Sequence, residues 1–163
     1  LPMTTISETG RNELLRALPG AVQAIVVGQG DRDSKLLAIA QHLHDQIDVY
    51  DWVGFYLVDP DAYRELVLGP YVGAPTDHTR IAFGTGICGQ AAETLETFVV
   101  DDVTKESNYL SCSINVKSEI VVPIMKGDTL IGELDIDSNT VAAMDATDKE
   151  VLEQVCTLIA GLY

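Results

Sequence analysis

The fold is decided by two neighbouring apolar segments, EIVVPIM (residues 119–125) and LIGELDID (residues 130–137). Both are rich in Val, Ile and Leu, and the Gly127-Asp128 pair between them has the composition of a hairpin turn. We therefore predict that the two segments form an antiparallel β-hairpin, around which the rest of the chain is arranged.

Further strands and helices are predicted on both sides of this hairpin. Aromatic and β-branched residues indicate strands at residues 51–58, 65–72, 79–83 and 98–101. Apolar residues at helical spacing and capping residues indicate helices at residues 13–27, from Asp31 or Asp33 to Ile47, at residues 90–95, and from Asp145 onward. This order predicts an α+β fold in which helices at both ends of the chain cover one face of a mainly antiparallel sheet.

Length and composition indicate one domain, residues 1–163, with enough apolar residues (47%) to form a core. Ten basic residues against 25 acidic ones give a net charge of −15, which disfavours nucleic acids and anionic membranes as partners. No apolar run approaches the roughly 18 residues of a membrane span. We expect a cytoplasmic protein in which residues 1–10 are a disordered or artificial leader.

A glycine-rich motif, GTGICG, occupies residues 84–89 and satisfies the dinucleotide-binding pattern G-x-G-x-x-G. An NAD enzyme is therefore one hypothesis. It is disfavoured because the following helix would have barely two turns and the flanking segments are hairpins rather than βαβ units. What remains is a turn whose backbone amides converge at a helix start, a place that suits a carboxylate or phosphate.

Two aromatic residues share one face of the strand at residues 51–58. Side chains alternate along a strand, so Trp52, Gly54 and Tyr56 point the same way, with a gap at the glycine. The pair either fills a core or forms a slot that would suit a cation or a methylated sulfur.

Three carboxylates, Glu133, Asp135 and Asp137, share one face of the last strand, an arrangement that calls for a cation, a bound proton or full solvation. Whether Glu119 joins them depends on the hairpin. A two-residue loop pairs Glu119 with Ile136 and puts it on the opposite face. A three-residue loop, or a bulge near Pro123, puts it beside the aspartates.

The three cysteines have different surroundings in the sequence. Cys156 lies in the apolar stripe of the last helix and is predicted to be a core residue. Cys88 lies in the glycine-rich turn and Cys112 in an aperiodic polar stretch, where a thiol is more often reactive. No spacing of His and Cys residues predicts a metal site, because His42 and His44 point in different directions on a helix.

Taken in order, these residues resemble the GAF-fold free methionine-(R)-sulfoxide reductases. The resemblance rests on WVGFY (residues 52–56), LVLGP (66–70), GICG (86–89), Asp102-Val103, Cys112, SEIVVP (118–123) and LDIDS (134–138). It implies a six-stranded antiparallel sheet flanked by N- and C-terminal helices, a homodimer, and reduction of free L-methionine-(R)-sulfoxide to methionine without a bound cofactor.

The resemblance also implies roles for individual residues. Cys112 matches the nucleophile, which attacks the sulfoxide sulfur and becomes a sulfenic acid as methionine leaves. Glu119 and Asp137 match acids that hydrogen-bond the sulfoxide oxygen, and Asp135 matches the acid that receives the substrate ammonium. At least one of these acids must carry a proton to help the oxygen leave.

Trp52 matches the aromatic residue that packs against the S-methyl group, and Tyr56 lines the same pocket. His78 stands ten residues before Cys88, where the family often has its resolving cysteine. Resolution then falls to Cys88 or to an external thiol such as thioredoxin or glutathione. Glu133 stands where the family has a small apolar residue. The alternative function is a non-catalytic GAF module that binds a small ligand or senses redox state.

Overall fold

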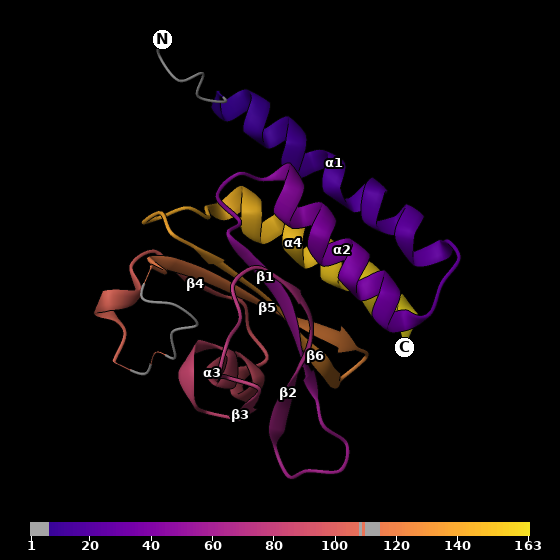
Figure 1. Cartoon of the computed structure of the whole chain (residues 1–163), viewed down its shortest axis with the longest axis vertical. Helices are drawn as coiled ribbons and strands as arrows, with labels where there is room; N and C mark the ends of the chain where they lie inside the picture. Colours follow the sequence, from indigo (N-terminus) through magenta and orange to yellow (C-terminus); the bar gives the residue numbers. More distant parts are fainter. Residues whose placement is uncertain (1–6, 108, 110–114) are drawn as a thin grey trace.

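A six-stranded sheet forms the centre of the computed structural model, which describes residues 7–107, 109 and 115–163 (Figure 1). Its strands are β1 (Trp52–Val58), β2 (Glu65–Val72), β3 (Arg80–Ala82), β4 (Phe98–Val100), β5 (Ser118–Lys126) and β6 (Thr129–Ser138). They are arranged in the order β3-β2-β1-β6-β5-β4, and every neighbouring pair is antiparallel. The antiparallel sheet is confirmed, and each strand lies within one residue of its predicted bounds.

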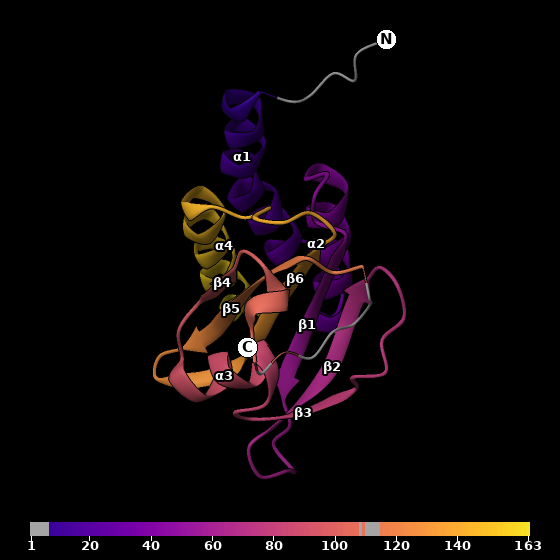
Figure 2. The same cartoon turned by 90° about the vertical axis from the view of Figure 1, so that its left-hand side faces the viewer.

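The described residues form four α-helices, α1 (Glu8–Val27), α2 (Arg32–Gln46), α3 (Gly86–Thr94) and α4 (Ala146–Ile159), with short 3₁₀ turns at Val103–Lys105 and Ala160–Leu162. Helices α1, α2 and α4 gather on one face of the sheet, and α3 lies on the other (Figures 1 and 2). The prediction that helices at both ends of the chain cover one face is therefore confirmed, and the short helix α3 covers the other face. β1 and β6 bury side chains on both of their faces, and the second face needs its own cover. None of the described helices is long and apolar enough to cross a membrane.

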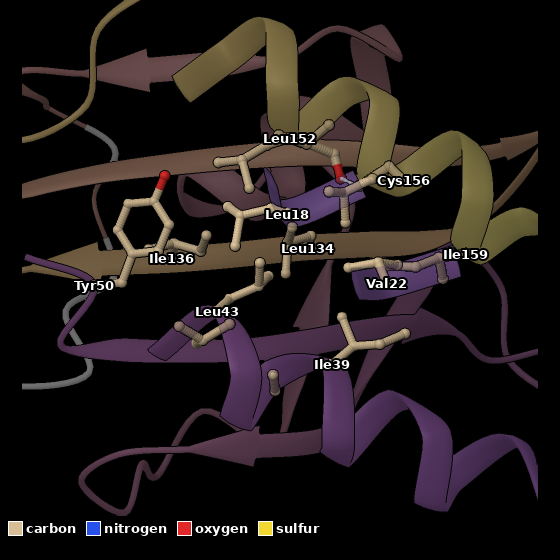
Figure 3. Packing of buried hydrophobic residues seen from close by; sticks show 14 of the residues in the cluster. Leu18, Val22, Ile39, Leu43, Tyr50, Leu134, Ile136, Leu152, Cys156 and Ile159 are labelled. Carbon is tan, nitrogen blue, oxygen red and sulfur yellow. Dashed lines mark hydrogen bonds between the residues drawn. The ribbon is translucent and has the colours of Figure 1, made fainter. Parts of the chain in front are cut away.

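The larger apolar core lies between the sheet and helices α1, α2 and α4 (Figure 3). Leu134 and Ile136 of β6 point into it and meet fully buried side chains from all three helices. Cys156 of α4 belongs to this core, with its sulfur 3.8 Å from the carbonyl oxygen of Val122. Its interpretation as a core residue is confirmed.

The β5–β6 hairpin combines a two-residue turn with a bulge. Gly127 takes a positive φ of 62°, and Lys126 pairs with Thr129 across the turn. The register then shifts between Ile124 and Met125, which leaves Ile131 as an extra residue on β6. The three-residue loop is thus wrong, and the bulge near Pro123 is confirmed. As a result Glu119 pairs with Asp137 and faces the same way as the other acids.

Two helices begin earlier than predicted. α3 starts at Gly86 rather than at residue 90, so Cys88 lies inside the helix and not in a turn. Since every sheet pairing is antiparallel, its glycines do not belong to a βαβ unit, and the dinucleotide-binding interpretation is wrong. α1 starts at Glu8, capped by the Ser7 hydroxyl, so residues 8–10 are helical rather than part of a disordered leader.

The other helix starts follow the predicted capping residues. Asp31, rather than Asp33, caps α2 by accepting a hydrogen bond from the Ser34 amide at 2.8 Å. Asp145 and Asp148 form a capping box at the start of α4. These caps fix where α2 and α4 meet the sheet.

Candidate active site

Four carboxylic acids are buried on the face of the sheet that α3 covers. They are Glu119 of β5 and Glu133, Asp135 and Asp137 of β6, and each is at most 4% exposed. In the described ranges no Lys or Arg forms a salt bridge with Glu119, Glu133 or Asp135. Buried carboxyls without cations must hold protons or await a cationic ligand. The arrangement therefore excludes the solvated surface that is the simplest interpretation of acids on a strand.

Burial raises the pKa of Glu119 well above its usual value, and the charges of Asp135 and Asp137 raise it further. Burial also raises the pKa of Asp135, although a hydrogen bond from Glu119 partly offsets this. The proton of the pair therefore belongs mainly to Glu119. A site with one protonated and one ionised carboxyl can donate a hydrogen bond to an oxygen atom and bind a cation at the same time.

Cys88 lies at the third residue of α3 and faces these acids. The Cys88 sulfur and one carboxylate oxygen each of Glu119 and Asp135 all lie within 4.8 Å of one another. A helix start usually lowers the pKa of a thiol. Here burial raises the pKa of Cys88 well above its usual value, and the neighbouring carboxylates, led by Asp135, add to the rise. Cys88 is therefore a thiol, not a thiolate, at neutral pH.

The spacing of Cys88, Glu119 and Asp135 would also admit a metal ion. Two of the three are carboxyls that share a hydrogen bond, and the third is a thiol that keeps its proton. Protons thus compete with a metal ion for every ligand atom. We interpret the group as a proton-sharing cluster and assign no metal to it.

Trp52 and Tyr56 lie beside the acids, and hydrogen bonds fix both side chains. The Trp52 indole donates to the carbonyl oxygen of Ala74 at 3.0 Å, and the Tyr56 hydroxyl donates to that of His78 at 2.8 Å. The two rings stack with centroids 6.3 Å apart. The strand therefore presents rigid aromatic surface next to the buried carboxyls.

The predicted slot at Gly54 is already filled. A Cβ atom at Gly54 would come within 2.5 Å of the Trp52 ring and 2.6 Å of Tyr71. Tyr71 lies across from Gly54 on β2, and its ring stacks on Trp52 with centroids 5.3 Å apart. The glycine thus makes room for Trp52 itself. Sequence reasoning missed Tyr71, because only the β1–β2 register shows that it belongs here.

Two cavities adjoin the site residues. One, of about 10 Å³, is lined by Tyr56, Cys88, Glu119 and Asp135 among others. The second, of about 110 Å³, is lined by Asp51, Trp52, Ala74, Asn115, Val116, Asp137 and Asn139. A larger depression of about 550 Å³ between α4 and β5 contains none of the four acids. The predicted substrate-binding residues therefore adjoin two small cavities on one face of the sheet.

Six of the seven predicted site residues lie on this face: Trp52, Tyr56, Cys88, Glu119, Asp135 and Asp137. The seventh, Cys112, lies outside the described residues. Asn115 and Val116, which follow it in the chain, line the cavity beside Trp52 and Asp137. Asn115 and Val116 thus place the start of the described chain before β5 beside the site.

Helices at both ends of the chain cover one face of an antiparallel sheet, and a small acidic and aromatic site lies under a short helix on the other face. This arrangement defines a GAF-type domain. The family model described as "GAF domain" matches residues 31–162. The chain is 36% identical to "GAF domain-containing protein A" of Dictyostelium discoideum, over 94% of this chain and 95% of the relative.

Two further relatives name a particular enzyme. The chain is 35% identical to a Saccharomyces cerevisiae protein named "Free methionine-R-sulfoxide reductase", over 94% of this chain and 87% of that protein. The crystal structure of the free methionine-R-sulfoxide reductase from Neisseria meningitidis in complex with its substrate superimposes with a TM-score of 0.89 at 34% identity, over 99% of this chain and 95% of that one. The chain belongs to the GAF-domain family of free methionine-(R)-sulfoxide reductases.

Proposed function

We propose that this protein reduces free L-methionine-(R)-sulfoxide to methionine, with Cys112 as the nucleophile and an external thiol as the final reductant. The observation that carries the proposal is the buried cluster of Cys88, Glu119 and Asp135, which places a thiol, a proton donor and an anion within 4.8 Å of one another. A relative of the same fold is known in complex with its substrate, which supports the choice of ligand.

The substrate's charges match the site. Asp135 is the carboxylate that receives the ammonium group, which supplies a cation to a cluster in which no described Lys or Arg forms a salt bridge with Glu119, Glu133 or Asp135. Glu119, whose pKa is raised, donates a hydrogen bond to the sulfoxide oxygen together with Asp137. The rigid face of Trp52 packs against the S-methyl group, and Tyr56 closes the same pocket.

The chemistry transfers one oxygen atom. The Cys112 thiol attacks the sulfoxide sulfur, the sulfur–oxygen bond of the substrate breaks, and methionine leaves while Cys112 becomes a sulfenic acid. A protonated carboxyl stabilises the oxygen as that bond breaks. The Cys88 thiol then condenses with the sulfenic acid to give a disulfide and water, and a dithiol such as thioredoxin, or glutathione, restores both thiols.

The test is methionine formation from the separate R and S epimers of free methionine sulfoxide, coupled to thioredoxin or glutathione recycling. We expect turnover of the R epimer only, no turnover in Cys112→Ser, and normal turnover in the core control Cys156→Ser. An active Cys112→Ser enzyme would exclude Cys112 as the nucleophile. A wild-type protein that binds methionine sulfoxide without turnover would instead support the non-catalytic GAF module.

The assembly expected of this enzyme is a homodimer in the cytoplasm. Light scattering on the purified protein tests the dimer, with a mass of about twice the 17.6 kDa of the chain as the expected result.

A further inference from the structure

Glu133 is a buried acid that the proposed reaction does not use. It is fully buried, and burial together with the charge of Asp135 raises its pKa well above the usual value. Among the described residues neither of its carboxylate oxygens has a hydrogen-bond donor, apart from the thiol of Cys88. An acid left in this state costs stability, so its retention inside the site calls for an explanation.

The strands around Glu133 leave it with few partners. Its neighbours across the sheet are Tyr56 on β1 and Pro123 on β5, and a proline has no amide hydrogen to donate. The Tyr56 hydroxyl donates to the carbonyl oxygen of His78. On its own strand the next residue on the same face is Asp135, which is also an acceptor. Cys88, on α3, is thus the proton-bearing group that Glu133 faces.

We infer that Glu133 is the proton carrier of Cys88: it takes the thiol proton when Cys88 attacks the oxidised sulfur, and passes it to the departing hydroxide. The inference rests on the proposed function, which supplies the sulfenic acid. In this step the sulfur–hydrogen bond of Cys88 and the sulfur–oxygen bond of the sulfenic acid break, a sulfur–sulfur bond forms, and water leaves. The Cys88 sulfur is oxidised, the sulfenic sulfur is reduced, and no other reductant is needed.

The need for a carrier comes from the environment of Cys88. Its pKa is raised by burial and by Asp135, Glu133, Glu119 and Asp137, so the thiolate is scarce at neutral pH. Glu119 and Asp135 already share one proton through their mutual hydrogen bond, whereas among the described residues neither carboxylate oxygen of Glu133 has such a partner. A carboxylate that accepts the proton during the attack avoids a free thiolate among four acids.

The experiment is a single turnover without external reductant. The fully reduced protein is mixed with one equivalent of free L-methionine-(R)-sulfoxide and quenched at intervals. Methionine is measured by chromatography, and the protein is analysed by mass spectrometry for sulfenic acid, trapped with dimedone, and for the disulfide. Variants are Glu133→Gln, Glu133→Asp, which keeps a carboxyl, and Glu13→Gln, which makes the same change on the exposed face of α1.

We expect one methionine per chain from all four proteins. Disulfide formation should be slowed at least tenfold in Glu133→Gln, a modest loss for a general base, so that trapped sulfenic acid accumulates. In the wild type and in Glu133→Asp the disulfide rate should rise with pH as the carboxyl ionises, and Glu133→Gln should lose this rise.

Three results would overturn the inference and leave the proposed function standing. In the first, Glu133→Gln forms the disulfide at the same rate and with the same pH profile as the wild type. In the second, Glu133→Gln loses the methionine burst while the wild type keeps it. In the third, the sulfenic acid of the wild type never reacts with Cys88. Absence of the methionine burst from the wild type itself would instead refute the proposed function.

Discussion

Glu119 lies directly opposite Asp137 across the β5–β6 hairpin, and the extra residue at Ile131 is what brings them together. The two-residue turn by itself would pair Glu119 with Ile136 and send the carboxyl into the apolar core. The bulge restores the register, so that Ile120, Val122 and Ile124 stay in the core while Glu119 joins the acids. One inserted residue thus serves both packing and chemistry.

The first prediction concerns the proton on Glu119. Glu119→Gln keeps the shape of the side chain but cannot give up a proton, so kcat/KM for free methionine-(R)-sulfoxide should fall by about 10² or more. Stability to urea should not fall, because the change removes a buried acid. Glu13→Gln is the control and should match the wild type in both measurements. An unchanged kcat/KM in Glu119→Gln would show that the proton comes from another acid.

Much of this site follows from alternation along single strands. Glu133, Asp135 and Asp137 had to share a face, as did Trp52 and Tyr56, because side chains alternate in any strand. Relations between strands are harder to predict. The bulge at Ile131 and the stacking of Tyr71 on Trp52 depend on which residues meet across the sheet, and local composition does not fix this.

The start of α3 shows how tertiary packing overrides local preference. Glycines are poor helix formers, and GTGICG therefore indicates a turn. In the structure Gly89 lies inside helix α3. Glycine is needed at this position, because a Cβ atom there would come within 2.6 Å of the carbonyl oxygen of Ala82. The close approach of α3 to the end of β3 is what requires glycine, and only the folded chain reveals that contact.

The second prediction is the pH dependence of stability at Glu133. The folded pKa of Glu133 lies above its unfolded value of about 4.3. The preference of the folded state for the protonated side chain therefore adds to the free energy of unfolding below that pH, and this contribution is lost as the pH rises through the folded pKa. Glu133→Gln has no such loss. The variant should therefore gain stability relative to the wild type as the pH rises, measured by urea unfolding across the acid to neutral range. A difference that stays constant with pH would contradict the raised pKa.

The third prediction concerns the space around Trp52. In Gly54→Ala the added methyl group would press on Trp52 and Tyr71, so stability should fall by about 1–3 kcal/mol and KM for methionine sulfoxide should rise. Gly20→Ala is the matched control, because Gly20 lies in helix α1 with nothing within 4 Å of its Cβ position. It should stabilise the protein by about 0.5–1 kcal/mol without affecting KM. A tolerated Gly54→Ala would mean that Trp52 is free to move.

The fourth prediction concerns Asp148, which ties α1 to α4 on the face away from the site. Arg11 donates two hydrogen bonds to its carboxylate, at 2.9 and 2.7 Å, and the Tyr50 hydroxyl donates a third at 2.6 Å. Burial opposes ionisation, but these hydrogen bonds prevail and lower the pKa of Asp148. Asp148→Asn should therefore lower the free energy of unfolding in urea by about 2–3 kcal/mol at neutral pH, because a buried, hydrogen-bonded charge is lost.

The pH dependence of this effect follows from the lowered pKa. The ionised Asp148 carboxylate stabilises the folded state above the unfolded pKa of about 3.9, so the difference from the wild type should shrink as the pH falls through the folded pKa. Arg16→Gln, which breaks the exposed pair with Glu150, is the control and should leave stability unchanged. Folded Asp148→Asn should retain full reductase activity, and a loss of activity without a loss of stability would show that this network also shapes the site.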